Sequence, residues 1–266
     1  MTTPFKFGSE FRINTATISQ QNAATLTALA DGRFVAVWVD GSGTGADTSA
    51  TAVRAQFFNA DGSKAGGEFL VNTTTAGFQN EPTVTSLADG RFVIAWTDSS
   101  ASGGDTSGNA LRAQIYNSNG TRSGGEFLAN TTTLNSQYTS SITALADGSF
   151  VLAWQDTSGV GDTSGTGIRG QHFSANGVKL GAEFLINTTT INHQLEPSIT
   201  ALADGGYVVA WTDYSMTGAD TSNTAIRAQV FNATGAKLGA EFVVNSLTWG
   251  GQYNASVAAL TDGRFV

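Results

Sequence analysis

The stretch WTDSSASGGDTSGNALRAQIYNSNG, which runs from Trp96 to Gly120, occurs four times in this chain with small changes. Trp38, Trp96, Trp154 and Trp211 each open a copy, and successive tryptophans lie 58, 58 and 57 residues apart. An internal period of this kind is typical of propellers, solenoids and repeat arrays. The fold of the whole chain therefore depends on what a single repeat builds.

One repeat contains four segments with the composition of β-strands. In the copy that includes Trp96, the alternating TVTSL at 83–87 and the apolar RFVIAW at 91–96 flank the turn sequence ADG, which predicts a hairpin. A loop rich in Gly, Ser, Asp and Thr follows, and then come ALRAQIYN at 110–117, a turn at 118–120 and GEFLAN at 125–130. Thr, Val, Phe and Gly are frequent and no segment has a helical period, so we expect four strands, A to D, and no helix.

Four antiparallel strands per repeat are the plan of a β-propeller blade. We predict an all-β single domain over residues 1–266, with complete blades at 24–72, 82–130, 139–187 and 196–245. The alternative is a stacked β-solenoid, whose repeats are usually shorter. The tryptophan that ends strand B is expected to pack between neighbouring blades.

The two ends of the sequence contain parts of further repeats. Glu10–Asn14 matches a strand D, and 255–266 matches a strand A with the beginning of a strand B. Together they predict a fifth, composite or incomplete blade, so we expect about five blades in all and a sequence that belongs to a longer chain. Because an unpaired edge strand recruits partner strands, Glu10–Asn14 also predicts self-association.

Composition excludes several classes of partner and chemistry. The net charge of −8 argues against nucleic acid and anionic membranes, which need a basic surface. No apolar run approaches the length of a membrane span, and MTTPFKFGSEF lacks the apolar core of a secretory signal peptide. The absence of cysteine removes disulfides, thiolate metal sites and cysteine nucleophiles.

The full repeat reads G-x-EF-x-x-N-(T)TT-x-x-x-Q … ALADG-x-FV-x-AW-x-D … D-T-S … R-A-Q-x-F-N-x-x-G. This pattern resembles the propeller-type repeats of large, secreted bacterial repeat proteins, which often lie near RTX-type calcium-binding segments. The resemblance covers nearly the whole chain. It implies type I secretion with an uncleaved C-terminal signal, and a location outside the cell or on its surface. The RTX nonapeptide GGxGxDxUx is absent, so calcium binding of that type does not follow.

The loops after the tryptophans carry paired aspartates, which are candidate calcium ligands because calcium prefers several oxygen ligands on a flexible loop. Their spacing matches no EF-hand, and Asp and Ser also shape turns through their own hydrogen bonds, which is the alternative interpretation. The pairs are Asp40 and Asp47, Asp98 and Asp105, Asp156 and Asp162, and Asp213 and Asp220.

Three further polar positions recur in register, and a structural role is the simplest interpretation. A glutamine lies between strands D and A, as in Gln79, an arginine lies in strand C, as in Arg112, and a glutamate lies in strand D, as in Glu126. Strands C and D are neighbours, so Arg–Glu pairs are expected across them. If these pairs are exposed, each contributes only about 0–1 kcal/mol to stability.

Side chains around the recurring glutamine differ from copy to copy and include many rings. In an up-and-down blade the D–A and B–C connections emerge on one face, which would then carry blade-specific aromatics beside polar loops. Such a face suits a sugar, although the rings could instead cover blade edges. The candidate ligand-binding residues are Phe78, Tyr138, His193, Trp249 and Tyr253.

Catalytic residues are sparse in this sequence. Glu81 and Glu196 are the only glutamates outside strand D, and both precede a proline at the start of strand A, which lines the central channel of a propeller. Some five-bladed glycosidases place carboxylates there, but a third central acid is not visible. His172 and His193 are the only histidines. The sequence therefore favours a non-catalytic extracellular module that binds polysaccharide or surface glycans, with a purely structural repeat and a glycosidase-like enzyme as alternatives.

Overall fold

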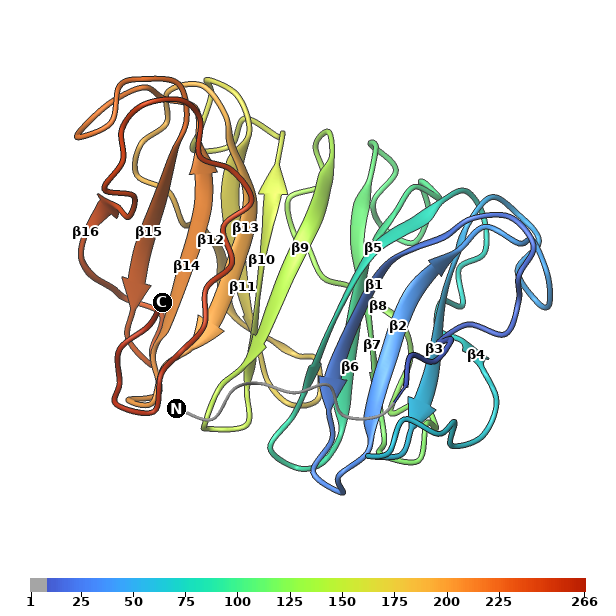
Figure 1. Ribbon diagram of the computed structural model, residues 1–266. Coiled ribbons are helices and arrows are strands. Elements are labelled where there is room, and N and C mark those ends of the chain that lie inside the picture. The colour runs from blue at the N-terminus through green and yellow to red at the C-terminus, as the bar shows by residue number, and fades with distance from the viewer. Residues whose placement is uncertain (1–8) are drawn as a thin grey trace.

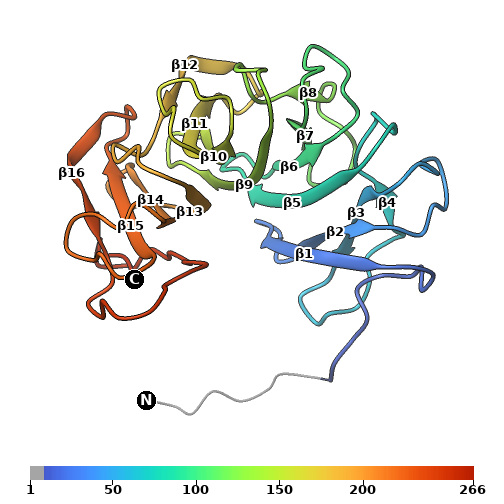
Figure 2. The same ribbon diagram turned by 90° about the horizontal axis from the view of Figure 1, so that it is seen from above.

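Sixteen β-strands make up the computed structural model, which describes residues 9–266, and no helix occurs within this range. The strands form four separate four-stranded sheets, each antiparallel with its strands in chain order. The sheets stand side by side around a centre, with their first strands innermost (Figures 1 and 2). The all-β prediction is confirmed, and this radial arrangement is that of propeller blades rather than of a stacked solenoid.

The predicted blades correspond closely to the four sheets. The first contains β1 (Gln21–Ala28), β2 (Phe34–Asp40), β3 (Ala52–Phe58) and β4 (Phe69–Leu70). The second contains β5 (Gln79–Ser86), β6 (Phe92–Asp98), β7 (Ala110–Tyr116) and β8 (Phe127–Leu128). The third contains β9 (Gln137–Ala144), β10 (Phe150–Asp156), β11 (Gly167–Phe173) and β12 (Lys179–Leu185). The fourth contains β13 (Gln194–Ala201), β14 (Tyr207–Asp213), β15 (Ala225–Phe231) and β16 (Lys237–Val243).

The outer strand is shorter in the first two blades than in the last two. β4 and β8 have two residues each, whereas β12 and β16 have seven. The sequence gives the reason. Adjacent glycines, Gly66–Gly67 and Gly124–Gly125, precede the short strands, whereas the long ones contain Leu-Gly-Ala at the same register. Glycine offers no side chain for packing and weakens a strand interior.

The core lies between the blades. Trp96 of blade two is fully buried against Val37 and Val53 of blade one, and Trp154 and Trp211 repeat this contact with the blade before them. The prediction that each tryptophan packs between blades is confirmed for these three. A large aromatic side chain buries a large apolar area, so these contacts help to attach adjacent sheets to each other.

The number of blades is four, and the prediction of about five is wrong. Glu10–Asn14 forms no strand; the Phe11 ring packs on blade one, with its centroid 5.4 Å from that of Phe58. Residues 255–266 form only a hairpin with one bridge, Ala259 to Phe265, and its Val257 packs on blade four. The two segments lie at opposite ends of an open arc, so they do not combine into a blade (Figure 2). Self-association through Glu10–Asn14 stays a prediction.

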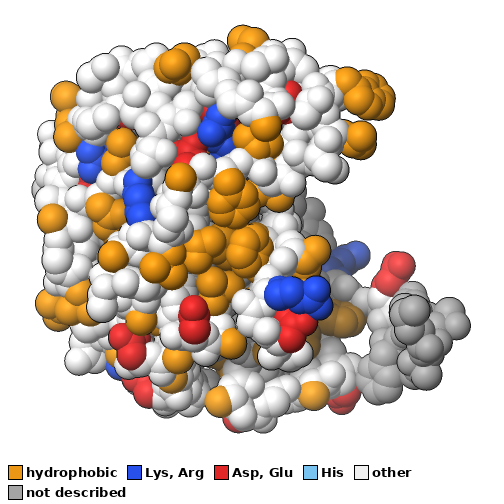
Figure 3. Space-filling view, turned by 90° about the vertical axis from the view of Figure 1, so that its left-hand side faces the viewer, with side chains coloured by type: hydrophobic (Ala, Val, Ile, Leu, Met, Phe, Trp, Pro, Cys, Tyr) orange, Lys and Arg blue, Asp and Glu red, His pale blue; other side chains and the backbone are white. Residues whose placement is uncertain are grey.

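The surface agrees with the low charge of the sequence. In the space-filling view, charged side chains are few, some of them in adjacent pairs of opposite sign, and apolar side chains gather near the middle of the face shown (Figure 3). Leu238 and Phe242, both on β16, are among the exposed apolar residues of the outer edge. Residues 9–266 contain no helix of sufficient length and apolarity for a membrane span.

Candidate functional site

Every innermost strand is interrupted by a bulge near its start. In β5 the pairing with β6 shifts register between Asn80 and Thr83, and the residue inside the shift, Glu81, has a φ of 51°. Bulges bend a strand and redirect a side chain, and they are common beside active sites. A non-glycine residue in this backbone region is strained, so the surrounding structure must hold it there. The same register carries Ala23, Glu81, Thr139, Glu196 and Asn254, all with φ between 49° and 57°.

We call these five positions the inner rim. Two of them are the glutamates that the sequence singled out, Glu81 in blade two and Glu196 in blade four. The other three rim positions hold Ala, Thr and Asn, so the rim contains no third acid.

The Glu81 carboxylate is held by its own blade and by the next one. Its Oε2 accepts hydrogen bonds from the Thr97 hydroxyl at 2.9 Å and from the backbone N–H of Thr139 at 2.8 Å. Thr97 comes from β6 and Thr139 from the bulge of β9. The bulge of one blade thus positions the carboxylate of its neighbour.

Glu196 in blade four has the same arrangement, two repeats further along the chain. Its Oε2 accepts from the Thr212 hydroxyl at 2.9 Å and from the backbone N–H of Asn254 at 3.2 Å. The side-chain amide of Asn254 makes hydrogen bonds when its nitrogen faces Glu196. That nitrogen then lies 3.1 Å from each of the two carboxylate oxygens. Every group that bonds to these two carboxylates is a hydrogen-bond donor, and together the donors fix the orientation of each carboxylate.

Both glutamates line one cavity of about 460 Å³ on the inner side of the arc. The lining also includes Thr139 and Gln155 of blade three, the blade between those of the two glutamates, and Asn254. No lysine or arginine is among the described residues that line the cavity. The cavity therefore combines two separately held carboxylates with neutral hydrogen-bonding groups, which is a suitable environment for a hydroxyl-rich, uncharged ligand.

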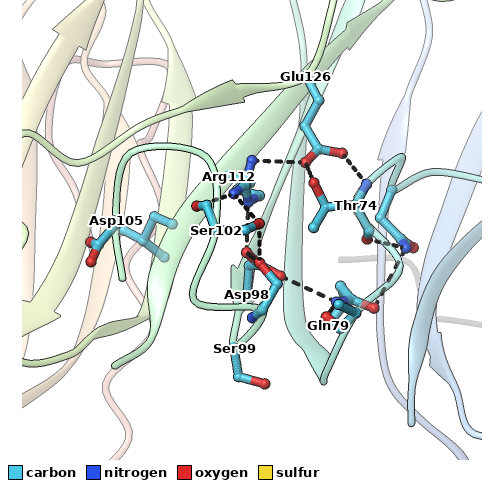
Figure 4. Close-up of polar contacts among 12 residues, drawn as sticks. Thr74, Gln79, Asp98, Ser99, Ser102, Asp105, Arg112 and Glu126 are labelled. Carbon is cyan, nitrogen blue, oxygen red and sulfur yellow. Dashed lines mark hydrogen bonds and ion pairs between the residues drawn. The ribbon is translucent and has the colours of Figure 1, made fainter. Parts of the chain in front are cut away.

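The aspartates at the ends of the second strands belong to buried ion pairs. In blade two, Asp98 accepts from Arg112 Nε at 2.6 Å, and Arg112 Nη1 also binds Glu126 at 3.1 Å (Figure 4). The side chains of Arg112 and Glu126 are 7% and 4% exposed. The expected Arg–Glu pairs are confirmed in blades two, three and four, but they are buried rather than exposed. The Arg–Asp pairs, absent from the sequence-based predictions, occur in all four blades.

This network also joins one blade to the next. Glu126 of blade two accepts from the backbone N–H of Thr73 at 2.6 Å and from the Thr74 hydroxyl at 2.7 Å, both in the segment that arrives from blade one. The recurring Gln79 donates to Asp98 at 3.2 Å (Figure 4). Burial raises the pKa of Glu126, but the hydrogen bonds from Thr74 and Thr73 outweigh it, so the pKa lies below its ordinary value. We call the Asp–Arg–Glu–Thr set the interblade latch.

The second aspartate of each loop has different partners. Asp105 accepts from the Ser107 backbone N–H at 3.1 Å and from the Asn130 amide at 2.7 Å, which ties the B–C loop to the end of strand D. The same Asp–Asn bond recurs at Asp47, Asp162 and Asp220. The bond from the backbone N–H of Ser107, two residues after Asp105, is that of an Asx turn. Residues 9–266 contain no cluster of three or more acidic or histidine side chains that could hold a metal ion, and calcium binding by the eight aspartates stays a prediction.

The five predicted ligand-binding residues all lie on D–A connections or at the beginning of strand A. Phe78, His193, Trp249 and Tyr253 are exposed, and Tyr138 is half-buried. The D–A segments contact the B–C loops, as expected: Ser99 Oγ accepts from the Phe78 backbone N–H at 2.7 Å, and the Thr166 backbone N–H donates to His193 Nδ1 at 3.2 Å. Tyr138 and Tyr253 directly precede the cavity residues Thr139 and Asn254. The two tyrosines are thus neighbours of cavity residues in the chain, and neither ring is among the described side chains that line the cavity.

The other histidine lies in a separate cavity on the opposite side of the blades. This space of about 390 Å³ is lined by Asp147, His172 and Phe184, and His172 Nε2 lies 2.8 Å from the Tyr207 hydroxyl. Burial lowers the pKa of His172 against the opposing effect of Asp147. The two histidines are thus far from forming one catalytic set.

No protein-family model matches this sequence, and no curated protein matches it. Solved structures do match. The GH93 α-L-arabinofuranosidase of Fusarium graminearum, solved with arabinobiose, is 13% identical with a TM-score of 0.54, covering 88% of this chain and 69% of its own. The polysaccharide lyase Uly1 is 10% identical with a TM-score of 0.55, covering 89% and 62%. An endo-arabinase from Bacteroides thetaiotaomicron is 16% identical with a TM-score of 0.48, covering 88% and 83%.

At these identities the similarity shows a propeller-like fold. The comparison contradicts the prediction of a non-catalytic binding, adhesion or spacer module, because the similar structures with TM-scores above 0.5 include α-L-arabinofuranosidases. The prediction that the protein is not an enzyme is corrected on the same ground. Sequence reasoning found Glu81 and Glu196 but set them aside for want of a third acid, and it had no means of seeing that the two face one cavity.

Proposed function

We propose that this protein is a glycoside hydrolase that acts on neutral glycans, with Glu81 and Glu196 as its pair of catalytic carboxylates. The observation that carries the proposal is their convergence: glutamates from blades two and four face the same 460 Å³ cavity. Glycoside hydrolysis generally uses two carboxyl groups on either side of the scissile bond. The similarity in fold to the GH93 arabinofuranosidase supports the proposal.

The reaction needs one carboxylic acid and one carboxylate. The acid protonates the glycosidic oxygen as the bond to the anomeric carbon breaks, so the leaving sugar departs as an alcohol. The other glutamate either deprotonates an attacking water or attacks the anomeric carbon directly. The threonines and backbone N–H groups that hold both side chains fix the carboxylates before the substrate arrives, which reduces the ordering required in the transition state.

The charge of the cavity distinguishes hydrolysis from elimination. A polysaccharide lyase removes the proton beside a uronate carboxylate, and that reaction needs a positive group or metal near the substrate anion. Two glutamates with no lysine or arginine among the described lining residues would repel a uronate. We therefore infer neutral sugars as substrates. The rings of Tyr138 and Tyr253, which precede cavity residues in the chain, are suited to stack on further sugar units, as was expected of the D–A face.

The repeat pattern also bears on where the enzyme works. Its resemblance to secreted bacterial repeat proteins supports our proposal that hydrolysis takes place outside the cell or at its surface. The low, acidic charge is compatible with a polysaccharide substrate and unfavourable for nucleic acid.

Hydrolysis is tested on 4-nitrophenyl α-L-arabinofuranoside, 4-nitrophenyl β-D-galactopyranoside, arabinan and β-1,3-galactan. We expect release of nitrophenol or reducing ends, and a loss of about 10²–10⁴-fold in kcat for Glu81→Gln and for Glu196→Gln. Asp61→Asn, at an exposed turn, is the matched control and should retain activity. Azide should restore turnover only to the variant that lacks the base or nucleophile. Unsaturated products would indicate a lyase, and full activity in both glutamine variants would refute the assignment.

A further inference from the structure

Blade three departs from the rule that blades two and four follow at the inner rim. In those two blades a rim glutamate is paired with a threonine on the neighbouring strand: Glu81 with Thr97, and Glu196 with Thr212. Blade three replaces both members, with Thr139 at the rim and Gln155 in place of the threonine. The shorter rim residue leaves space, and the longer strand residue lines that space.

The side chain of Gln155 is largely buried and has no hydrogen-bond partner among the described residues, but its amide is not among the fully enclosed polar groups. Gln155 is 4% exposed and lines the cavity that the two glutamates share. The amide therefore reaches the space of the cavity, where water or a ligand can bond to it. Largely buried polar side chains are nearly always bonded, so this one is expected to bond to water or to a ligand in the cavity.

We propose that Gln155 is a specificity-determining residue that binds hydroxyl groups of the sugar held between Glu81 and Glu196. This inference rests on the proposed function and adds to it. A carboxamide offers an acceptor oxygen and two donor hydrogens on adjacent atoms, and two neighbouring sugar hydroxyls offer the same combination in return. The Tyr138 ring is the cross-strand partner of Gln155, so an apolar surface lies beside the amide on the same side of the sheet.

The position in the cavity of the two glutamates determines what this contact discriminates. A site built to bond a substrate hydroxyl rejects analogues that lack it, because the amide is then left unpaired again. We therefore expect the enzyme to distinguish a sugar from its deoxy analogue at this subsite. The neutral amide also adds no positive charge for a uronate, which agrees with a neutral substrate.

Two substitutions separate this role from a structural one. Gln155→Met keeps the length of the side chain and removes both hydrogen-bonding groups. Gln155→Thr introduces the residue that blades two and four carry at this register, so the fold should accept it. Melting temperatures of both variants are measured first, and the threonine variant provides the readout if the methionine variant does not fold.

Binding of arabinobiose and of β-1,3-galactobiose is measured by ligand-observed NMR in an otherwise inactive Glu81→Gln background. We expect Gln155→Met to raise the Kd by about 5- to 100-fold. In the active enzyme, KM for the 4-nitrophenyl glycoside should rise, and the preference for the parent glycoside over its 2- and 3-deoxy analogues should fall to near unity for at least one of them.

The outcomes distinguish this inference from the proposed function. If Gln155→Met and Gln155→Thr bind sugars and discriminate deoxy analogues as the wild type does, the role of Gln155 is refuted while hydrolysis by Glu81 and Glu196 stands. If the wild type binds a disaccharide but hydrolyses none, the proposed function fails and the Kd comparison still decides the role of Gln155. If the wild type neither binds nor hydrolyses any of these sugars, both proposals are refuted, and the amide binds water only.

Discussion

The interblade latch and the inner rim are both repeated in register, but they differ in what the repeats preserve. The arginine of the latch and its aspartate partner are the same in all four blades. The rim has the same strained backbone at five positions but four different residue types. A side chain that all four blades carry is explained by a structural need that every blade shares, as in the Asp–Arg pair between its second and third strands. A side chain that only some blades carry, on a backbone that all share, is available for a function of the whole arc.

This comparison predicts opposite effects of substitution in the two regions. Arg112→Ala would leave Asp98 and Glu126 buried without their cation, and we expect a loss of about 3–5 kcal/mol in the free energy of unfolding. Glu81→Ala, on the exposed rim, should change that free energy by roughly 0.5 kcal/mol or less. Urea denaturation followed by tryptophan fluorescence measures both. Equal losses in the two variants would remove the distinction between latch and rim.

A smaller effect is expected from acid. The pKa of Glu126 lies below its ordinary value of 4.5 in the folded protein, since the hydrogen bonds from Thr74 and Thr73 outweigh burial. The unfolded chain therefore binds a proton at this group more readily than the folded one. Its stabilising contribution is complete above about pH 4.5 and is lost as the pH falls through the folded pKa.

Glu126→Gln should accordingly lower stability at neutral pH and flatten its dependence on pH below 4.5. The measurement is the melting temperature as a function of pH in both proteins. Asp61→Asn, at an exposed turn, provides the comparison and should follow the wild-type curve more closely. A pH dependence in Glu126→Gln as steep as that of the wild type would show that this member of the latch does not contribute.

The smallest effect is expected from metal removal. If calcium occupied the paired aspartates, a chelator would lower the melting temperature, because a ligand that binds only the native state stabilises it. Asp98 and Asp105 already accept bonds from Arg112 and Asn130, so we expect little change with chelator or with millimolar calcium. A clear fall with chelator that calcium reverses would support the calcium hypothesis and revise the description of the latch.

Part of the candidate site could be identified from the sequence. Glu81 and Glu196 were recognisable because they break the repeat, in which all other glutamates lie in strand D, and because a proline follows each. Gln155 gave no such signal. It replaces the threonine that Thr97 and Thr212 represent in the other repeats, and one polar residue in place of another on an otherwise apolar strand does not stand out. Its importance depends on an unpaired amide, which is a property of the surroundings and not of the residue.

The sequence by itself determined the local structure: four strands per repeat, the turns between them, the tryptophan contacts and the Arg–Glu pairs. These follow from short-range periodicity, turn residues and neighbouring strands, all of which one repeat specifies. Only the tertiary structure decided that four blades form an open arc, that the first aspartate of each loop pairs with an arginine, and that the glutamates of blades two and four share a cavity. The Asp–Arg pairs depend on how side chains of one blade are oriented. The open arc and the shared cavity depend on the angle at which each blade meets the next, which is set by side-chain packing across the interface and accumulates over the whole arc.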